Sequence, residues 1–211
     1  MTQGRGIFIT VEGGEGCGKS TLIRGLAEVL SQQGRTVKTT REPGGTPLAE
    51  SVRQLVLSPP AEEAWSPLAE ALLMNAARSD HVDRKIRPWL EQGSWVLCDR
   101  FSDSTLVYQG VGGVSSSILK VMQAEVTADA HPDITLILDA EPEALLQRRE
   151  ARSTTDVFER KPLDFHKAVR REFLNIAQED PDRCVILDAL QSPEAMVQSA
   201  MQAIQSRFSL A

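Results

Sequence analysis

A glycine-rich segment near the start of the chain restricts the possible folds more than any other feature of the sequence. Residues 13–20 read GGEGCGKS and match the pattern G-x-x-x-x-G-K-[ST]. An apolar run, Ile7–Val11, precedes this segment, and a helix-like segment, Leu22–Gln33, follows it. In a strand–loop–helix unit of this kind, the glycines let backbone N–H groups point inward, and the positive end of the helix adds to their attraction for anions. The segment therefore predicts a loop that binds the phosphates of a nucleotide.

The residues of this phosphate loop have separate expected roles. Lys19 should reach the β- and γ-phosphates, and the hydroxyl of Ser20 should bind Mg²⁺. Cys17 is interpreted as a small filler rather than a nucleophile. Glu15 is unusual, because an acid opposes the charge of a loop that binds anions; it either faces solvent or bonds a donor or a water near the second substrate. The expected ATP-binding residues are Gly13, Gly14, Glu15, Gly16, Cys17, Gly18, Lys19, Ser20 and Thr21.

Apolar runs and helix-period segments alternate along the rest of the chain. The predicted strands are Ile7–Val11, Thr36–Thr40, Trp95–Asp99, Ile134–Asp139 and Cys184–Asp188. The predicted helices are Leu22–Gln33, Leu48–Val56, Leu68–Leu90, Ser116–Ala128, Pro142–Arg152, Asp164–Glu179 and Pro193–Phe208. This alternation predicts an α/β protein with three αβα layers, in which helices cover both faces of a five-stranded parallel sheet. Because the chain has 211 residues and no linker, we expect a single domain, residues 1–211.

The composition argues against several classes of protein. The net charge of -6 disfavours binding to duplex nucleic acid, which needs a basic surface. No apolar stretch reaches the roughly 18 residues of a membrane span, and no signal peptide opens the chain. The cysteines have neither disulfide nor metal spacing. His81, His131 and His166 also lack ligand spacing and are interpreted as structural or surface residues. We therefore expect a cytoplasmic enzyme with no nucleic-acid or membrane partner.

Charged residues follow the second and third predicted strands, at the sheet edge where the phosphate loop should lie. Pro43 begins a turn with two glycines that should place Arg41 beside the loop. Asp99 ends the third strand, a position from which an acid contacts Mg²⁺ directly or through water. Arg100 can bind an anion through two parallel hydrogen bonds. Together these residues suggest a second phosphate at this edge. The chain length and the absence of an N-K-x-D guanine signature favour a compact kinase with a small acceptor.

Several motifs are similar to those of the thymidylate kinase family. After EGGEGCGKST come TREPGGT (residues 40–46), AAR (residues 76–78) and DRFSDSTLVYQG (residues 99–110). The resemblance spans nearly the whole chain. It implies a P-loop kinase fold with a helical lid, a cytoplasmic homodimer, and phosphorylation of dTMP to dTDP by ATP with Mg²⁺. It also suggests that the helices around Ala71–Val82 and Ser116–Ala128 pack across the dimer interface.

The resemblance implies roles for individual residues of the acceptor site. Arg41 and Arg100 would hold the phosphate of dTMP, with Pro43 in the turn beside them, and Arg78 would hydrogen-bond the edge of thymine. Met74 stands where the family usually stacks a phenylalanine on the base, which leaves open how far dUMP is tolerated. The remaining expected contacts are Thr105 and Gln109 near the base, Tyr108 near the 2′ position of the sugar, and Glu15 near the 3′-hydroxyl.

The last expected part of the site is a lid, at about residues 148–161. Positioned arginines give the main help to the charged transition state of phosphoryl transfer, and the phosphate loop contains none. Arg148 and Arg152 share a helix face and are expected to supply this help. Val157 occupies a position where the family often has an arginine, so Arg160 is an alternative. The expected catalytic residues are Lys19, Arg148, Arg152 and Glu15, and the expected metal contacts are Ser20 and Asp99.

Two alternative functions stay open at this point. A deoxynucleoside kinase on the same scaffold would phosphorylate a hydroxyl and would need a general base, for which Glu42 is the candidate. A switch protein that gates a partner through its nucleotide state would hydrolyse ATP slowly, without any dependence on a monophosphate. A monophosphate acceptor needs no base, because a phosphate with a second pKa of about 6 is already largely ionised near neutral pH.

Overall fold

Five parallel strands form the centre of the fold, in the order β2-β3-β1-β4-β5. The structure is a computed structural model that describes residues 4–60, 63–145 and 157–208. The strands are β1 (Phe8–Gly13), β2 (Val37–Arg41), β3 (Trp95–Asp99), β4 (Ile134–Asp139) and β5 (Cys184–Asp188). Each neighbouring pair is parallel, as predicted. All the carboxyl ends therefore lie at one edge of the sheet, which is where ligands bind in open α/β folds.

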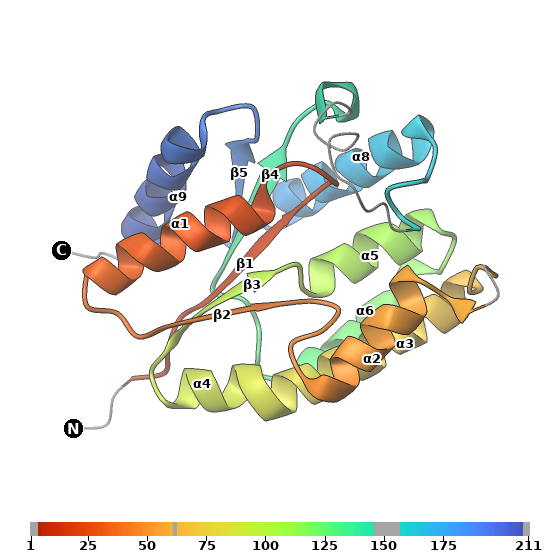
Figure 1. The fold of residues 1–211 in the computed structure, drawn as a ribbon, viewed down its shortest axis with the longest axis horizontal. Helices are drawn as coiled ribbons and strands as arrows, with labels where there is room; N and C mark the ends of the chain where they lie inside the picture. The colour runs from red at the N-terminus through yellow and green to blue at the C-terminus, as the bar shows by residue number, and fades with distance from the viewer. Residues whose placement is uncertain (1–3, 61–62, 146–156, 209–211) are drawn as a thin grey trace.

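Helices cover both faces of this sheet (Figure 1). The helices among the described residues are α1 (Lys19–Gln32), α2 (Pro47–Leu57), α3 (Pro67–His81), α4 (Arg87–Glu91), α5 (Ser102–Val111), α6 (Ser116–Thr127), α8 (Leu163–Glu179) and α9 (Pro193–Phe208). Two short elements, the π-helical turn η2 (Val82–Ile86) and the 3-10 turn η3 (Pro142–Leu145), complete them. Helices α1 and α9 pack on one face, whereas α4, α5 and α8 pack on the other. The fold is thus the expected three-layer αβα arrangement.

Strand β1 shows how the side-chain alternation of a strand places a charged residue in the interior. Ile9 and Val11 are fully buried against α1 and α9. Phe8 lies in the core under α4 on the opposite face. Glu12 falls on that same face by the period of two, and it is fully buried at the start of α5. The strand therefore delivers an acid to the protein interior, directly behind the phosphate loop.

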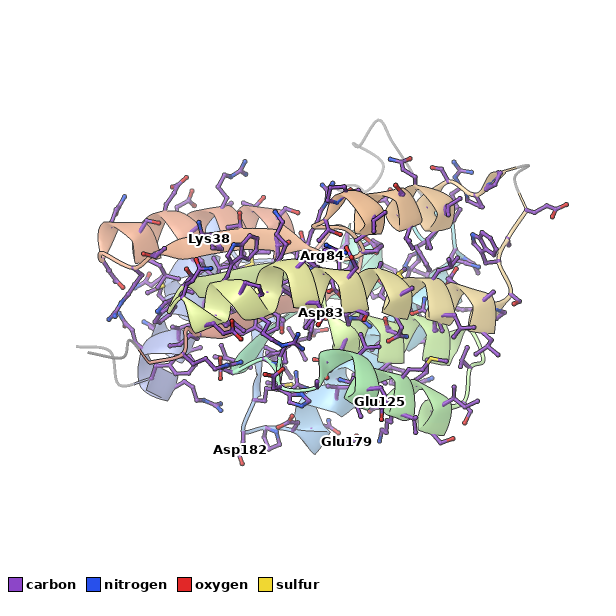
Figure 2. The ribbon with its side chains drawn as sticks, turned by 90° about the horizontal axis from the view of Figure 1, so that it is seen from below. Lys38, Asp83, Arg84, Glu125, Glu179 and Asp182 are labelled. Carbon is purple, nitrogen blue, oxygen red and sulfur yellow. The ribbon has the colours of Figure 1, made fainter. Side chains whose placement is uncertain are left out.

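Two features of the helices differ from the sequence-based expectation, and a third predicted helix is described only in part. Helix α5 was not among the predicted helices. The predicted helix Leu68–Leu90 is a continuous rod made of α3, η2 and α4, with Asp83 and Arg84 in its π-helical turn (Figure 2). Of the predicted helix Pro142–Arg152, only the 3-10 turn η3 is described, and the remainder lies outside the described residues. No helix in residues 4–60, 63–145 and 157–208 is long and apolar enough to span a bilayer.

Candidate active site

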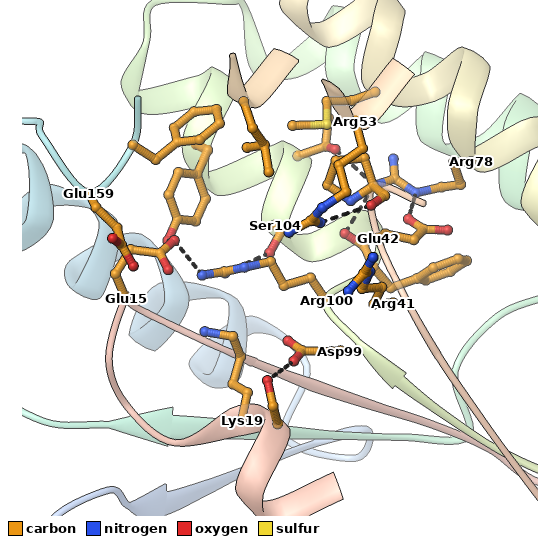
Figure 3. A pocket seen from close by; sticks show the side chains of 18 of the residues that line it. Glu15, Lys19, Arg41, Glu42, Arg53, Arg78, Asp99, Arg100, Ser104 and Glu159 are labelled. Carbon is orange, nitrogen blue, oxygen red and sulfur yellow. Dashed lines mark hydrogen bonds and ion pairs between the residues drawn. The ribbon is translucent and has the colours of Figure 1, made fainter. Parts of the chain in front are cut away.

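A cavity of about 230 Å³ opens at the carboxyl ends of β1, β2 and β3 (Figure 3). The phosphate loop, the turn after β2, and helices α2, α3 and α5 line it, and Phe158 and Glu159 contribute from the segment before α8. All the residues expected at the acceptor site line this one cavity: Glu15, Arg41, Pro43, Met74, Arg78, Arg100, Thr105, Tyr108 and Gln109. So do Gly16, Gly18, Lys19, Ser20 and Asp99 from the donor side. The structure therefore joins the two expected binding sites in one cleft.

The phosphate loop has the backbone that its glycines predict. Gly13, Gly16 and Gly18 all have positive φ angles, a region that other residues rarely adopt. A Cβ atom on Gly13 would lie 2.4 Å from the carbonyl oxygen of Leu138, so the loop also needs glycine there for space. The Lys19 ammonium is buried and donates to the carbonyls of Gly13 (3.2 Å) and Gly14 (2.8 Å). The loop thus carries its one cation on its inner side.

Ser20 and Asp99 meet across the ends of α1 and β3. The Ser20 hydroxyl donates to the Asp99 carboxylate over 2.7 Å (Figure 3). Both groups are oxygen ligands of the kind that Mg²⁺ prefers, and Mg²⁺ bound beside phosphates needs only one or two such protein ligands. The donor set therefore fits the magnesium ion expected with ATP.

Arg100 is the residue that joins the third strand to the phosphate loop. Its φ of 66° is unusual for a residue other than glycine, and it turns the side chain back over the loop. Nη1 donates to the Gly13 carbonyl over 2.9 Å, and Nη2 donates to the carboxylate of Glu15 over 2.6 Å. The guanidinium also lies over the ring of Tyr108, 5.0 Å from its centroid. A cation is therefore fixed at the centre of the cleft.

Glu15 bonds two donors, which agrees with the second of its two expected roles and not with a solvent-facing side chain. It accepts from Arg100 and, over 2.9 Å, from the hydroxyl of Tyr108. Burial acts to raise the pKa of Glu15, but the charges of Arg100 and Lys19 and the Tyr108 hydrogen bond outweigh it and lower that pKa to about 2. Glu15 is therefore ionised throughout the neutral range.

Glu12, for which no role was predicted, supports Arg100 through the hydroxyl of Ser104. Its carboxylate accepts from the backbone N–H groups of Phe101 and Ser104 and from the Ser104 hydroxyl, the last over 2.6 Å. The same hydroxyl accepts from Nη1 of Arg100 over 3.1 Å. Burial and then the charge of Asp103 raise the pKa of Glu12 to about 7, against the opposing effects of Arg100, Ser104 and Phe101. The first turn of α5 is thus held against β1 by a buried acid.

Arg78 occupies the inner wall of the cleft, on α3. Its Nε donates to the carboxylate of Glu42 over 2.7 Å, and its Nη2 donates to the Thr105 hydroxyl (2.9 Å) and to the Phe101 carbonyl (3.1 Å). Arg78 and Glu42 are both buried. Glu42 is therefore part of an ion pair, which weighs against its use as a general base for a hydroxyl acceptor.

The other residues expected near the base also come from α3 and α5. Met74 lies on the cleft wall and packs in the same apolar cluster as Tyr108. The side-chain amide of Gln109 donates to Glu70 over 2.8 Å, so it is held in place by α3. These side chains form an apolar wall with fixed polar groups, a pattern that suits a planar ligand.

Arg53 is a cleft residue that reasoning from the sequence missed. It lies on α2, lines the cavity, and donates to the carbonyl of Pro43 over 2.9 Å. Arg41 is more exposed and pairs with Glu50 over 3.1 Å. Arg53 shares a face of α2 with Glu50, and Glu50 accepts from the backbone N–H of Gly45 in the turn after β2. The cleft thus contains a further cation next to Arg41.

Of the arginines expected in the lid, the structure describes Arg160 alone. Arg148 and Arg152 lie outside the described residues. Arg160 is exposed and does not line the cavity. Phe158, from the described end of the lid, packs edge-on against Tyr108 with 5.4 Å between the ring centroids.

The fold and the site together define a phosphotransferase with the P-loop kinase fold, in which a nucleotide phosphate loop faces a cationic cleft for a second, planar substrate. The thymidylate kinase family model matches residues 11–200 of the chain. A thymidylate kinase of Caulobacter vibrioides is 48% identical over 211 residues, which cover 100% of both chains. A thymidylate kinase of Bradyrhizobium sp. (strain ORS 278) is 49% identical over 209 residues, covering 97% of this chain and 92% of the relative.

A solved structure supports the same assignment. The thymidylate kinase of Ehrlichia chaffeensis superposes with a TM-score of 0.78 and 33% identity, covering 95% of this chain and 100% of its own. The chain belongs to the thymidylate kinase family.

Proposed function

We propose that the chain transfers the γ-phosphoryl group of ATP to the phosphate of dTMP, giving dTDP, in the cleft between the phosphate loop and helices α3 and α5. The observation that carries the proposal is the position of Arg100, which bonds both the backbone and the Glu15 carboxylate of the phosphate loop while it lines the acceptor cleft. One residue therefore contacts the donor loop and faces the acceptor.

Binding two polyanions next to each other is the main difficulty of this reaction, because the acceptor phosphate is itself largely ionised at neutral pH. Arg41, Arg53 and Arg100 place three cations around the acceptor end of the cleft. Lys19 serves the phosphates of ATP at the other end. These charges offset the repulsion and hold the reacting groups in line. Positioning and electrostatic stabilisation of this kind supply most of the rate acceleration in such reactions.

Ser20 and Asp99 would hold the magnesium ion of ATP. When bound, Mg²⁺ neutralises charge that develops on the phosphate oxygens. The hydrogen bond between Ser20 and Asp99 holds both oxygen ligands at one point beside Lys19.

We also propose that Arg148 and Arg152 complete the site from the lid, with Arg160 as the alternative. The support is chemical: among the described loop residues only Lys19 is a cation, and spread negative charge in the transition state needs further donors. Phe158 packs on Tyr108, so the described end of the lid already contacts the acceptor wall.

The two alternatives find less support in the cleft. A kinase with a hydroxyl acceptor would need a base, but Glu42 is engaged by Arg78 and His81 and is buried. A switch protein would not need the second cationic cleft that faces the phosphate loop.

We further propose a homodimer through helices α3 and α6. Four large apolar side chains are exposed on these helices: Leu68, Leu72, Ile118 and Val121. Figure 2 shows α6, with Glu125, beside the rod that carries Asp83. Exposed apolar groups on adjacent elements mark protein interfaces. The resemblance also carries the expectation of a cytoplasmic location, which stays a prediction.

The direct experiment offers one acceptor at a time to the protein with ATP and Mg²⁺, and measures ADP release. We expect rapid turnover with dTMP, slower turnover with dUMP, and none above background with dCMP, dGMP, AMP or thymidine. Turnover with thymidine but not dTMP would support the deoxynucleoside kinase instead. Slow hydrolysis that ignores every acceptor would support the switch protein.

A further inference from the structure

His81 lies in a closed socket behind the acceptor cleft, at the end of α3. Its side chain has no exposed surface. Nδ1 lies 2.9 Å from a carboxylate oxygen of Glu42, and Nε2 lies 2.7 Å from the hydroxyl of Thr40. A Cβ atom on Gly45 would come within 2.3 Å of Nε2, so only glycine fits there. Thr40, Glu42 and Gly45 all belong to the TREPGGT segment, which therefore encloses the imidazole.

The hydrogen-bond chemistry of this socket fixes which nitrogen carries the proton. An ionised carboxylate can only accept, so Nδ1 of His81 must donate to Glu42. In a neutral imidazole the other nitrogen is then an acceptor, and the Thr40 hydroxyl can donate to it. The two contacts thus hold the ring in one tautomer and one orientation.

Glu42 transmits this orientation to Arg78. One Glu42 oxygen binds His81, and the other accepts from Nε of Arg78 over 2.7 Å. The side chains of Arg78, Glu42 and His81 are each at least nine-tenths buried, so water does not easily replace either contact of the Glu42 carboxylate. The carboxylate is therefore held at both ends and cannot rotate away from the arginine.

The remaining contacts of Arg78 leave one donor for a ligand. A guanidinium has five N–H groups. Within the described residues, Nε bonds Glu42, Nη2 bonds both Phe101 and Thr105, and Nη1 makes one long contact of 3.4 Å to Asn75. One N–H of Nη1 stays available on a residue that lines the cleft. A single fixed donor matches a carbonyl oxygen on the base and does not match an amino group.

We propose that His81 is a positioning residue for base recognition: it fixes Glu42, which fixes Arg78 so that one Nη1 N–H faces the carbonyl of the acceptor base. The inference rests on the proposed function, because it assumes a nucleotide acceptor in the cleft. His81, which the sequence analysis interprets as a structural or surface residue, therefore acts on the selectivity for the base through Glu42 and Arg78.

The test compares variants that remove one contact of the imidazole at a time. His81→Gln places an amide near the Nε2 position and loses the Glu42 contact, whereas His81→Asn places a donor near Nδ1 and keeps it. We expect His81→Gln to raise the KM for dTMP about tenfold and to weaken the preference for dTMP over dCMP. The KM for ATP should change less than twofold, and His81→Asn should restore most of the loss.

A double-mutant cycle with Arg78→Lys separates positioning from simple loosening. If His81 acts through the guanidinium, His81→Gln adds little to the KM for dTMP once Arg78 is lysine. The proposal would be overturned if the double variant raised the KM for dTMP by the product of the two single effects. An unchanged KM for dTMP in a folded His81→Gln variant would also overturn it. Val82→Ala is the matched control, because Val82 is the next residue and is fully buried but packs in the core cluster with Phe8. An equal rise in KM for this variant would also overturn it.

The unmutated protein gives a second test that needs neither activity nor a variant. Nitrogen-15 NMR of the His81 ring should show a proton on Nδ1. Protonation on Nε2 alone would contradict the proposed contact with Glu42, even if every variant failed to fold. A chain that does not phosphorylate dTMP would instead refute the proposed function, whichever tautomer is found.

Discussion

The Nη2 atom of Arg100 lies 2.6 Å from a carboxylate oxygen of Glu15, so the strand-end arginine and the acid of the phosphate loop form an ion pair across the floor of the cleft. Both side chains are mostly buried. The pair explains how an acid can belong to a loop that binds anions: its charge is balanced by a cation that also faces the acceptor. It keeps Arg100 at one place before any substrate binds.

Replacing Arg100 by lysine should therefore impair acceptor binding more than donor binding. Lysine keeps the charge but has one terminal nitrogen, whereas Arg100 bonds Gly13 and Ser104 through Nη1 and Glu15 through Nη2. We expect kcat/KM for dTMP to fall by roughly a hundredfold while the KM for ATP changes much less. Steady-state kinetics with each substrate varied in turn measures this. Arg171→Lys, at an exposed site on α8, is the control and should behave like the wild type.

The buried acid Glu12 should make stability depend on pH. Its pKa is about 7 in the folded protein, against an ordinary value of 4.5, so the folded state binds the proton more tightly than the unfolded state. The stability that this proton contributes is complete below about pH 4.5 and is lost as the pH rises through about 7. Relative to Glu12→Gln, the unfolding free energy of the wild type should fall by up to roughly 3 kcal/mol over this window. Urea denaturation at several pH values measures it; parallel profiles for the two proteins would contradict the account.

Met74→Phe should tighten the binding of the base. An aromatic ring stacks on a planar ligand with about 0.5–1.5 kcal/mol beyond its buried area, whereas a thioether contact is weaker or equal. We expect the KM for dTMP to fall roughly two- to tenfold, with little change in the KM for ATP. Kinetics with dTMP and dUMP would show it. A higher KM for both would mean that the methionine side chain does not lie against the base.

The proposed dimer should separate when its apolar face receives a charge. Val121 on α6 is 64% exposed in one copy of the chain, and Val121→Asp would bury an uncompensated carboxylate in the interface. We expect the variant to sediment as a monomer at micromolar concentration. Ile186→Asp is the matched control, since Ile186 is 47% exposed on β5, away from α3 and α6. Loss of the dimer in both variants, or in neither, would count against this interface.

Much of this architecture was accessible from the sequence because its elements follow simple periods. Each predicted strand is a β-branched apolar run, and all of them occur in the parallel sheet. Helix α5 was missed for a physical reason: its buried residues include Ser102, Asp103, Thr105 and Gln109, which do not form an apolar stripe. Their burial is balanced by hydrogen bonds across the fold, such as those from Arg183 to Asp103.

The roles of Glu12, Glu42 and His81 could not be read from spacing alone. Each depends on a partner far away in the chain, brought close only by the packing of α3 and α5 against the sheet. Arg53 was hidden in the same way, because one arginine on an amphipathic helix looks like any solvated surface residue. The motifs indicated which strand ends carry the residues of the cleft. The contacts that hold those residues from behind became visible only in the folded structure.

The most direct test of the central claim follows the phosphorus atoms themselves. The protein is mixed with ATP, Mg²⁺ and dTMP, and phosphorus-31 NMR records the products over time. The account predicts that ATP and dTMP signals decline together while ADP and the two coupled resonances of dTDP appear, without a matching rise in inorganic phosphate. Growth of inorganic phosphate with dTMP unchanged would contradict it, since the cleft would then direct the phosphoryl group to water and not to a second nucleotide.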